Sequence, residues 1–310
     1  MGISEFVEFE DTESIKQEHV VIIDGNNIAN IVLYSNFLDD YANGDFRVLK
    51  IGLIQMMFDI IIRLKATRAV IAFDSGKNWR YEIFKEYKAN RKKQYGRYTL
   101  DKKAFVEAIN EVFDFLHTYM TNMMVIKVDN AEGDDIIAVG AKYIFNKENY
   151  DITVVSTDKD MYQLLMNSNV RIYNPRHSKY VEVLNPKMEH EIKLIIGDKN
   201  SDNIPGIKRM VGKVTAEKII KSPDGLEGYI NSLPTKLEQE TVSKNYELNT
   251  LLIDFDYIRQ DIVDDIKKKY KQYKYIPLDG KKLTKELMKR KLTGVYKKWN
   301  MLSEPLKRLK

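Results

Sequence analysis

The acidic residues best suited to chemistry come in short clusters, and each cluster follows a run of apolar residues. Asp24 ends the run that begins at Val20, and Asp74 ends the run that begins at Ala69. Two further clusters follow the runs 124–128 and 152–155, and they hold Glu132, Asp134, Asp135, Asp158 and Asp160. Continuous apolar runs are typical of parallel strands that are buried on both faces. Because ligands of open α/β sheets bind beyond the carboxyl ends of the strands, we expect these acids to meet at one edge of one sheet.

Carboxylates that meet in this way repel one another, and cations are needed to neutralise them. The chain has no cysteine, which excludes disulfides and thiolate metal sites, and the acidic clusters contain no histidine. Oxygen ligands alone favour Mg²⁺ or Mn²⁺. The clusters therefore predict a divalent-metal site, and the substrate that suits such a site is a phosphodiester.

Apolar runs and helical stretches alternate through the first half of the chain. The sequence predicts strands at 20–23, 69–73, 124–128, 152–155 and 170–173, and helices at 47–66, 102–121, 134–147 and 159–167. Alternation of this kind predicts a parallel sheet with helices on both faces. Helix signals dominate from about Glu189 onward, between turns that contain proline or glycine. We therefore expect an α/β core over 1–188 and a mostly helical region over 189–310.

Basic residues are concentrated in two segments, although the net charge of the chain is only +5. Residues 85–103 contain eight Lys or Arg against two acids, and residues 281–310 contain eleven against two. The first segment lies in a connection over 76–103 that is longer than most loops and carries six aromatic residues. Aromatic side chains among cations suit single-stranded nucleic acid, because bases stack and phosphates pair with charge. The alternative for each segment is a solvated surface helix.

Neither a membrane span nor a secretory signal is expected. Residues 1–18 are acidic and lack the apolar core of a signal peptide. The longest apolar stretch, 51–64, contains Gln55 and Asp59 and is too short to span a bilayer. A chain of 310 residues is expected to form one large domain or two modest ones.

Each acidic motif also has an ordinary structural explanation. Asp24 and Asp74 stand in sequences that are common in turns, and the cluster 132–135 would cap a helix. Two more acids, Asp198 and Asp202, lie in a loop ahead of a proline. With the cluster that holds Asp158 and Asp160, the acidic motifs number five. Five such motifs in this order are hard to explain as caps and turns alone.

In this order the motifs resemble those of the 5′-nuclease superfamily, which includes flap endonucleases, the 5′-nuclease domain of bacterial DNA polymerase I and phage 5′→3′ exonucleases. The resemblance runs from Asp24 to about Ala216, and the stretch Tyr87-Lys88-Ala89-Asn90-Arg91 is similar to the family's arch-base motif. The stretch 252–258 resembles the phage ribonucleases H of T4-like viruses. The resemblance implies a PIN-like core with a basic arch insertion near 76–103, and a helical lobe that contains a helix–hairpin–helix (H3TH) motif.

The resemblance also implies roles for individual residues. The acids around a first metal ion would be Asp24, Asp74, Glu132, Asp134 and Asp158. The acids around a second ion would be Asp160, Asp198 and Asp202, with Asp135 acting through water. Lys88 and Arg91 would face the scissile phosphate, and Tyr87 would stack on a base. DNA-backbone contacts would come from Lys85, Lys92, Lys93, Gly206, Lys208, Gly212, Lys213 and Thr215.

Two departures from the family pattern leave questions open. The family spaces its last two acids three residues apart, whereas Asp198 and Asp202 are four apart, so which of them binds metal stays open. The hairpin over 206–216 is one residue longer than in the family and lacks one glycine, which leaves its monovalent-ion site open. Its backbone amides are still expected to meet a phosphate at a helix N-terminus.

We therefore expect a monomeric, Mg²⁺-dependent 5′→3′ exonuclease and flap endonuclease with ribonuclease H activity. It would bind two ions, accept Mn²⁺ in place of Mg²⁺, and remove RNA primers and 5′ flaps from duplex DNA during replication, leaving 5′-phosphates. The expected partners are flapped duplex DNA or RNA–DNA hybrid, with a single-strand-binding protein or a sliding clamp, in the cytoplasm of a phage-infected bacterium. The alternatives are a single-strand ribonuclease of the PIN type and a non-catalytic, structure-specific DNA-binding protein.

Overall fold

The computed structural model describes residues 18–35, 46–90, 101–146 and 150–310, and its body is built on one six-stranded sheet. The strands are β1 (Glu18–Asp24), β2 (Arg68–Phe73), β3 (Met124–Lys127), β4 (Tyr150–Val155), β5 (Val170–Asn174) and β6 (Lys179–Tyr180). Their order is β3-β2-β1-β4-β5-β6, and of these strands only the two-residue β6 runs antiparallel to its neighbour. The predicted parallel sheet is confirmed.

The register of the central strands brings the predicted acids to one edge of the sheet. Asp24 lies beside Ala72, which stands two residues before Asp74. On the other side of β1, Ile23 lies beside Val155 at the end of β4. Because the strands are parallel, the loops that follow β1, β2 and β4 all leave from the same edge.

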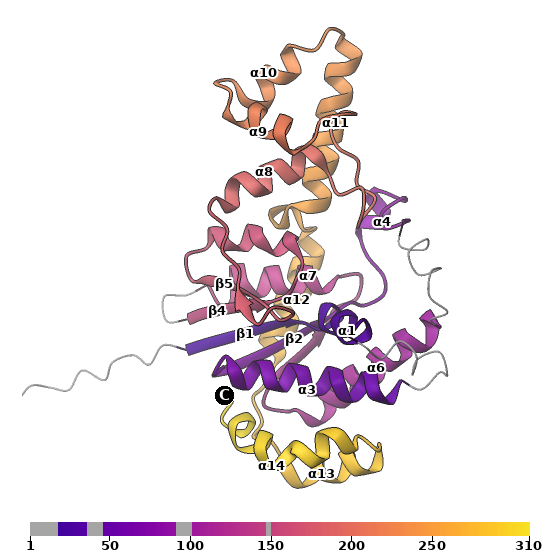
Figure 1. Cartoon of the computed structure of the whole chain (residues 1–310), viewed down its shortest axis with the longest axis vertical. Helices are drawn as coiled ribbons and strands as arrows, with labels where there is room; N and C mark the ends of the chain where they lie inside the picture. Colours follow the sequence, from indigo (N-terminus) through magenta and orange to yellow (C-terminus); the bar gives the residue numbers. More distant parts are fainter. Residues whose placement is uncertain (1–17, 36–45, 91–100, 147–149) are drawn as a thin grey trace, which may run out of the picture.

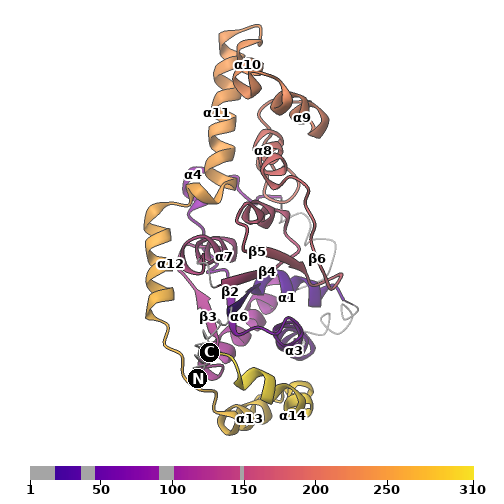
Figure 2. The same ribbon diagram turned by 90° about the vertical axis from the view of Figure 1, so that its left-hand side faces the viewer.

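Helices cover both faces of the sheet, and each face has its own apolar core (Figure 2). One face carries α1 (Gly25–Leu33), α3 (Arg47–Arg63) and α6 (Lys102–Tyr119). The other carries α7 (Gly133–Val139), the π-helical turn η1 (Gly140–Ile144), the 3₁₀ helix η2 (Lys159–Met166) and α12 (Gln260–Gln272). Residues of β1 alternate between the two cores: Val21 and Ile23 belong to the first, and Val20 and Ile22 to the second.

A glycine allows α12 to pack closely against η1 and α7. A Cβ on Gly140 would lie 2.3 Å from the hydroxyl oxygen of Tyr270. That hydroxyl donates a hydrogen bond to the carbonyl of Ile136 at 3.2 Å. Any larger side chain at position 140 would displace Tyr270, and with it α12.

A helical lobe extends from the body on the side opposite α13 (Gly280–Lys289) and α14 (Thr293–Lys307) (Figure 1). It consists of α8 (Pro186–Ile196), α9 (Lys213–Lys221), α10 (Gly225–Asn231) and α11 (Lys236–Ile253). These helices share a separate apolar core, which includes Ile192, Ile195, Ile207, Ala216 and Val242. After residue 189 the elements of the described structure are all helices, but only those up to α11 form this lobe.

The chain returns to the α/β body after α11, whereas the sequence predicted one helical region over all of 189–310. A 3₁₀ turn, η3 (Phe255–Tyr257), leads into α12, which packs on α7. The last helices, α13 (Gly280–Lys289) and α14 (Thr293–Lys307), pack on α3 at the opposite end of the molecule from α9 and α10. The physical reason is the apolar stripe of α14, with Val295, Trp299 and Leu302, which joins the core under α3.

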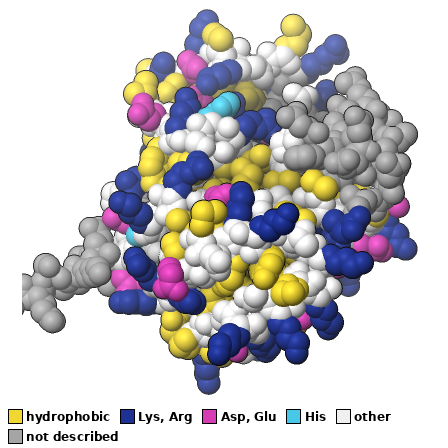
Figure 3. Space-filling model, turned by 60° about the horizontal axis from the view of Figure 1, so that its bottom comes forward, with side chains coloured by type: hydrophobic (Ala, Val, Ile, Leu, Met, Phe, Trp, Pro, Cys, Tyr) yellow, Lys and Arg dark blue, Asp and Glu magenta, His cyan; other side chains and the backbone are white. Residues whose placement is uncertain are grey.

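The surface formed by α13 and α14 is strongly basic. All eleven Lys and Arg of residues 281–310 are exposed. Figure 3 looks toward this end and shows many Lys and Arg side chains around patches of apolar ones. In the described ranges, none of the helices is long and apolar enough to cross a membrane.

Candidate metal and nucleic-acid site

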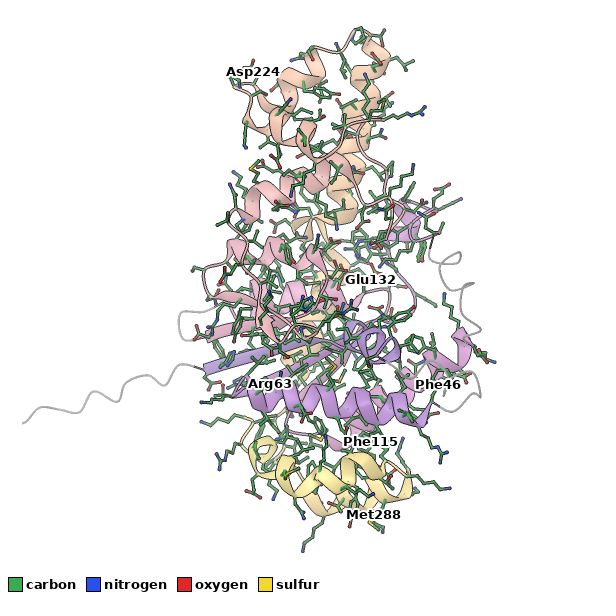
Figure 4. All side chains as sticks on the ribbon, viewed as in Figure 1. Phe46, Arg63, Phe115, Glu132, Asp224 and Met288 are labelled. Carbon is green, nitrogen blue, oxygen red and sulfur yellow. The ribbon has the colours of Figure 1, made fainter. Side chains whose placement is uncertain are left out.

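A pocket of about 520 Å³ lies at the carboxyl ends of β1, β2 and β4. The acids that line it are Asp24, Asp74, Glu132, Asp134 and Asp158, which is the whole set expected around a first metal ion. Figure 4 shows Glu132 near the middle of the molecule, below the helical lobe. A larger cavity of about 650 Å³ lies against β3 and α6, and none of the predicted site residues lines it.

The aspartates at the ends of β1 and β2 are held by donors from neighbouring loops. Asp24 begins α1, and its carboxylate accepts hydrogen bonds from the N–H of Asn27 at 2.9 Å and the hydroxyl of Ser156 at 3.0 Å. Asp74 accepts from the N–H of Gly133 at 2.7 Å. Each carboxylate therefore receives a donor from a different loop: one bond joins the ends of β1 and β4, and the other joins the loops that follow β2 and β3.

Two asparagines that were not singled out from the sequence also join these loops. The side-chain oxygen of Asn26 accepts from the N–H of Asp74 at 3.0 Å. The side-chain amide of Asn27 donates to the hydroxyl of Thr157 at 2.8 Å and accepts from its N–H at 3.1 Å. Their position directly after Asp24, at a strand end, was the only signal in the sequence.

Burial and mutual repulsion raise the pKa values of two pocket acids. Burial, with the nearby charges of Asp74 and Asp158, raises the pKa of Asp24 to about 7. Burial, together with Asp24 and Asp158, holds the pKa of Asp134 well above its usual range, although Lys88 opposes this. These acids carry charge at neutral pH only at a cost, which a bound cation would relieve.

Glu132 behaves differently because cations already face it. Burial alone would raise its pKa, but Lys88 and Arg80 outweigh burial and lower the pKa to about 2. The ammonium group of Lys88 contacts one carboxylate oxygen of Glu132, and it lies 3.8 Å from Oδ2 of Asp202. Lys88 thus lies inside the acidic pocket, and the role implied by the resemblance, facing the scissile phosphate, stays a prediction.

Tyr87 does not lie where base stacking would place it. Its ring is only 3 % exposed, so no base can stack on it in this arrangement. Its hydroxyl lies 2.9 Å from Oε2 of Glu132 and 3.0 Å from Oδ2 of Asp202. Tyr87 therefore links two acids from different elements. The short helix α4 (Arg80–Ile83) and the turn after it place Tyr87 and Lys88 at the pocket.

Asp135 does not lie where its predicted role, acting on an ion through water, would place it. Its side chain is fully buried and does not line the pocket. Its oxygens accept from the guanidinium of Arg80 at 2.8 and 3.0 Å and from the indole N–H of Trp79 at 3.1 Å. It also accepts from the N–H of Glu132 at 3.0 Å, which closes the first turn of α7. Asp135 holds the backbone of Glu132 in place from behind.

The acids expected around a second ion lie near the pocket but face different cations. Asp160 on η2 and Asp198 after α8 both contact the ammonium group of Lys193. Asp202 instead faces Tyr87 and Lys88. The four-residue spacing explains the difference, because the chain closes a tight turn in which the N–H of Asp202 donates to the carbonyl of Asp198 at 3.2 Å.

The turn before Asp198 requires glycine. Gly197 has a φ of +67°, in the left-handed region, and a Cβ there would lie 2.4 Å from the carbonyl oxygen of Pro205. This close approach lets α8 end directly beside the loop 198–204.

The donor chemistry of the pocket fits a hard divalent cation, because its acids supply only carboxylate oxygens. Among the described residues, no group of three or more His, Asp or Glu side chains is arranged to hold a metal ion as it stands. Carboxylates without a shared cation stay apart, and Glu132 and Asp160 already contact lysines. An ion would therefore have to draw the pocket acids together.

The predicted DNA-backbone residues that the structure describes do not line the pocket. Lys85 is exposed in the turn after α4, whereas Arg91, Lys92 and Lys93 lie outside the described residues. The remaining residues belong to the segment that leads into α9, and they are Gly206, Lys208, Gly212, Lys213 and Thr215. Gly212 and Thr215 are exposed at the start of α9, as a phosphate contact requires.

A turn at the end of α11 joins the helical lobe to the acidic pocket. The guanidinium of Arg80 donates to the carbonyl of Leu252 at 2.8 Å. The side chain of Gln163, on η2, donates to the carbonyl of Ile253 at 3.1 Å and accepts from the N–H of Phe255 at 2.9 Å. The 252–255 turn is thus bonded to the elements that carry both groups of acids. Neither Arg80 nor Gln163 was singled out from the sequence, since only the fold brings residue 163 to residue 253.

Comparison with known proteins agrees with this geometry. Residues 19–193 match the family model described as the 5′-3′ exonuclease, N-terminal resolvase-like domain. The chain is 30 % identical to the ribonuclease H of Enterobacteria phage T4, over 84 % of this chain and 89 % of that protein. It is 26 % identical to the flap endonuclease Xni of Pseudoalteromonas translucida, over 79 % of this chain and 94 % of that protein. The chain therefore belongs to the 5′-3′ exonuclease family, and the predicted nuclease class is confirmed.

A solved structure shares the fold. A bacteriophage T5 flap endonuclease, in a pseudo-enzyme–product complex with DNA and metal ions, superposes with a TM-score of 0.62. The match covers 82 % of this chain and 100 % of that chain, at 22 % sequence identity. The predicted PIN-like 5′-nuclease fold is therefore confirmed.

Proposed function

We propose that this protein is a Mg²⁺-dependent 5′→3′ exonuclease and flap endonuclease with ribonuclease H activity, which removes RNA primers and 5′ flaps from duplex DNA. The observation that carries the proposal is the convergence of Asp24, Asp74, Glu132, Asp134 and Asp158 on one pocket. Burial and mutual repulsion raise the pKa values of two of these acids, so the pocket favours a divalent cation. The relatives named above are a ribonuclease H and a flap endonuclease, which supports the substrate class.

The pocket acids would hold Mg²⁺ or Mn²⁺, with a second ion near Asp160 and Asp198. Bound divalent ions acidify water and stabilise charge on oxygen during phosphodiester hydrolysis. Among the protein's own groups, Lys88 offers a positive charge inside the pocket, where charge develops on the phosphate. Asp135 and Tyr87 hold Glu132 in position from two sides. The proposed products carry a 5′-phosphate and a 3′-hydroxyl.

The helical lobe would bind the duplex. Gly212 and Thr215 are exposed at the start of α9, where free backbone amides and the helix dipole favour a phosphate. Lys213 adds charge at the same place, although it pairs with Glu189 at 2.8 Å. Phosphate contacts of this type fix the position of a duplex without reading its sequence. We further propose that the protein acts as a monomer in the host cytoplasm, with a single-strand-binding protein or a sliding clamp as partner.

Cleavage of three 5′-labelled substrates would test the proposal: a 5′-flap duplex, a nicked duplex and an RNA–DNA hybrid, each with Mg²⁺ and with EDTA. We expect Mg²⁺-dependent cleavage near the junction and from the 5′ end, with no product from the Asp134→Asn variant. Binding of the forked duplex without cleavage would instead support a structure-specific DNA-binding protein. Preference for unstructured RNA would support a PIN-type ribonuclease.

A further inference from the structure

Lys193 is a charged residue that the sequence did not single out, and it lies between the acids expected around a second ion. It stands in the last turn of α8, between the buried side chains of Ile192 and Leu194. Its ammonium group contacts the carboxylate of Asp160 on η2 and lies 3.1 Å from Oδ2 of Asp198. One positive group thus bridges two acids that come from different elements.

This bridge is sheltered from water. The side chain of Lys193 is 20 % exposed, and those of Asp160 and Asp198 are 16 % and 20 % exposed. Charges at such positions are screened less than surface charges, so two carboxylates held this close need a cation. The end of α8 also favours a positive group, because the helix dipole is negative there. Lys193 therefore supplies the charge that these acids require.

A divalent ion would need the same carboxylate oxygens. An oxygen that accepts from the ammonium group of Lys193 is not free to bind an ion from the same direction. The two cations therefore compete for Asp160 and Asp198. Lysine is suited to such an exchange, because its four-carbon stem is flexible and its charge is compact.

We propose that Lys193 is the internal counter-ion of Asp160 and Asp198, and that a second divalent ion binds there only by displacing its ammonium group. This inference rests on the proposed function, since it takes these acids as metal ligands. It makes the two ions unequal with respect to Lys193, because the pocket around Asp24 and Asp134 takes the first ion without displacing it, although Lys88 contacts Glu132 there. A bound phosphodiester would attract the displaced ammonium group, so substrate should strengthen binding of the second ion.

Mn²⁺ titration of the whole, DNA-free protein tests this, with bound and free ion followed by electron paramagnetic resonance and calorimetry. We expect the native protein to bind one Mn²⁺ more tightly than a second. In Lys193→Met the second ion should bind about tenfold more tightly, which is about 1.4 kcal/mol. The matched control is Lys187→Met, in the first turn of the same helix, where the side chain is 78 % exposed. This control should bind both ions as the native protein does.

The outcomes separate the inference from the proposed function. Unchanged or weaker binding of the second ion in Lys193→Met would overturn the displacement model while leaving the nuclease proposal intact. Failure of the native protein to bind any Mn²⁺, together with failure to cleave, would overturn the proposed function itself. Should Lys193→Met not fold without metal, Lys193→Gln and the rise in melting temperature with Mn²⁺ provide the second test. A larger rise than in the native protein supports displacement, and an equal or smaller rise refutes it.

Discussion

The metal-free protein should lose stability as the pH rises from 5.5 to 8, and Asp24 should contribute a measurable part of that loss, beside Asp134. Burial and the neighbouring acids raise the pKa of Asp24 from 3.8 to about 7 in the folded state. Between these two values the folded state binds a proton that the unfolded state has released. Stability is therefore greatest below the unfolded pKa, and the contribution is lost as the pH rises through 7.

The size of this effect follows from the two pKa values. A pKa difference of about three units corresponds to about 4 kcal/mol when the group passes from fully protonated to fully ionised in both states. Over the narrower range from pH 5.5 to 8, the loss is about 2 kcal/mol. At pH 5.5 Asp24 is already ionised in the unfolded chain, so the part of the loss that occurs below this pH is not included. A saturating divalent ion should abolish the loss, since it stabilises the ionised carboxylate.

Urea unfolding in EDTA at the two pH values measures this loss. Asp24→Asn keeps an acceptor for the N–H of Asn27 but has no charge to titrate, so its free energy of unfolding should change less with pH than that of the native protein. The matched control is Asp129→Asn, an exposed acid after β3, which should retain the native pH dependence. A native-like loss in Asp24→Asn would show that the pocket acids do not repel one another as the geometry implies.

Three further changes test other parts of the site. Lys88→Ala should lower kcat more than it weakens DNA binding, because the charge matters most as charge develops on the phosphate; equal losses in gel-shift and cleavage assays would reduce Lys88 to a docking group. Gln163→Leu leaves two buried backbone groups of the 252–255 turn without partners, so it should lower the free energy of unfolding in urea by about 1–3 kcal/mol. The control Gln239→Leu loses one half-buried hydrogen bond to a carbonyl and should lower it less. Lys213→Ala should reduce the slope of log affinity for duplex DNA against log salt by about one, and an unchanged slope would exclude a phosphate contact there.

Much of the core was accessible from the sequence because its signals are local. Apolar runs of four or five residues can be recognised as buried parallel strands, and parallel strands bring their carboxyl ends to one edge. The gathering of the acids at one edge follows from that rule, whereas the choice of five of them around a first ion came from the family resemblance. The boundary of the helical lobe did not follow, because an amphipathic helix does not specify which apolar surface it will cover. Helices α12 and α14 return to the body for that reason.

Individual roles within the site depended on contacts between distant residues. Tyr87 and Asp135 matched the family's motifs, but the fold buries both and gives them acids and Arg80 as partners. Lys193 and Gln163 carry no motif, and their importance arises only where α8, η2 and the end of α11 meet.

The sequence by itself determined the kind of chemistry, since the order of the acids along the strands sets the sheet edge at which they gather. Only the tertiary structure decided which charge neutralises which. That depends on distances between side chains more than thirty residues apart, such as Lys193 and Asp160, and the free energy of a charge pair changes steeply with distance and burial.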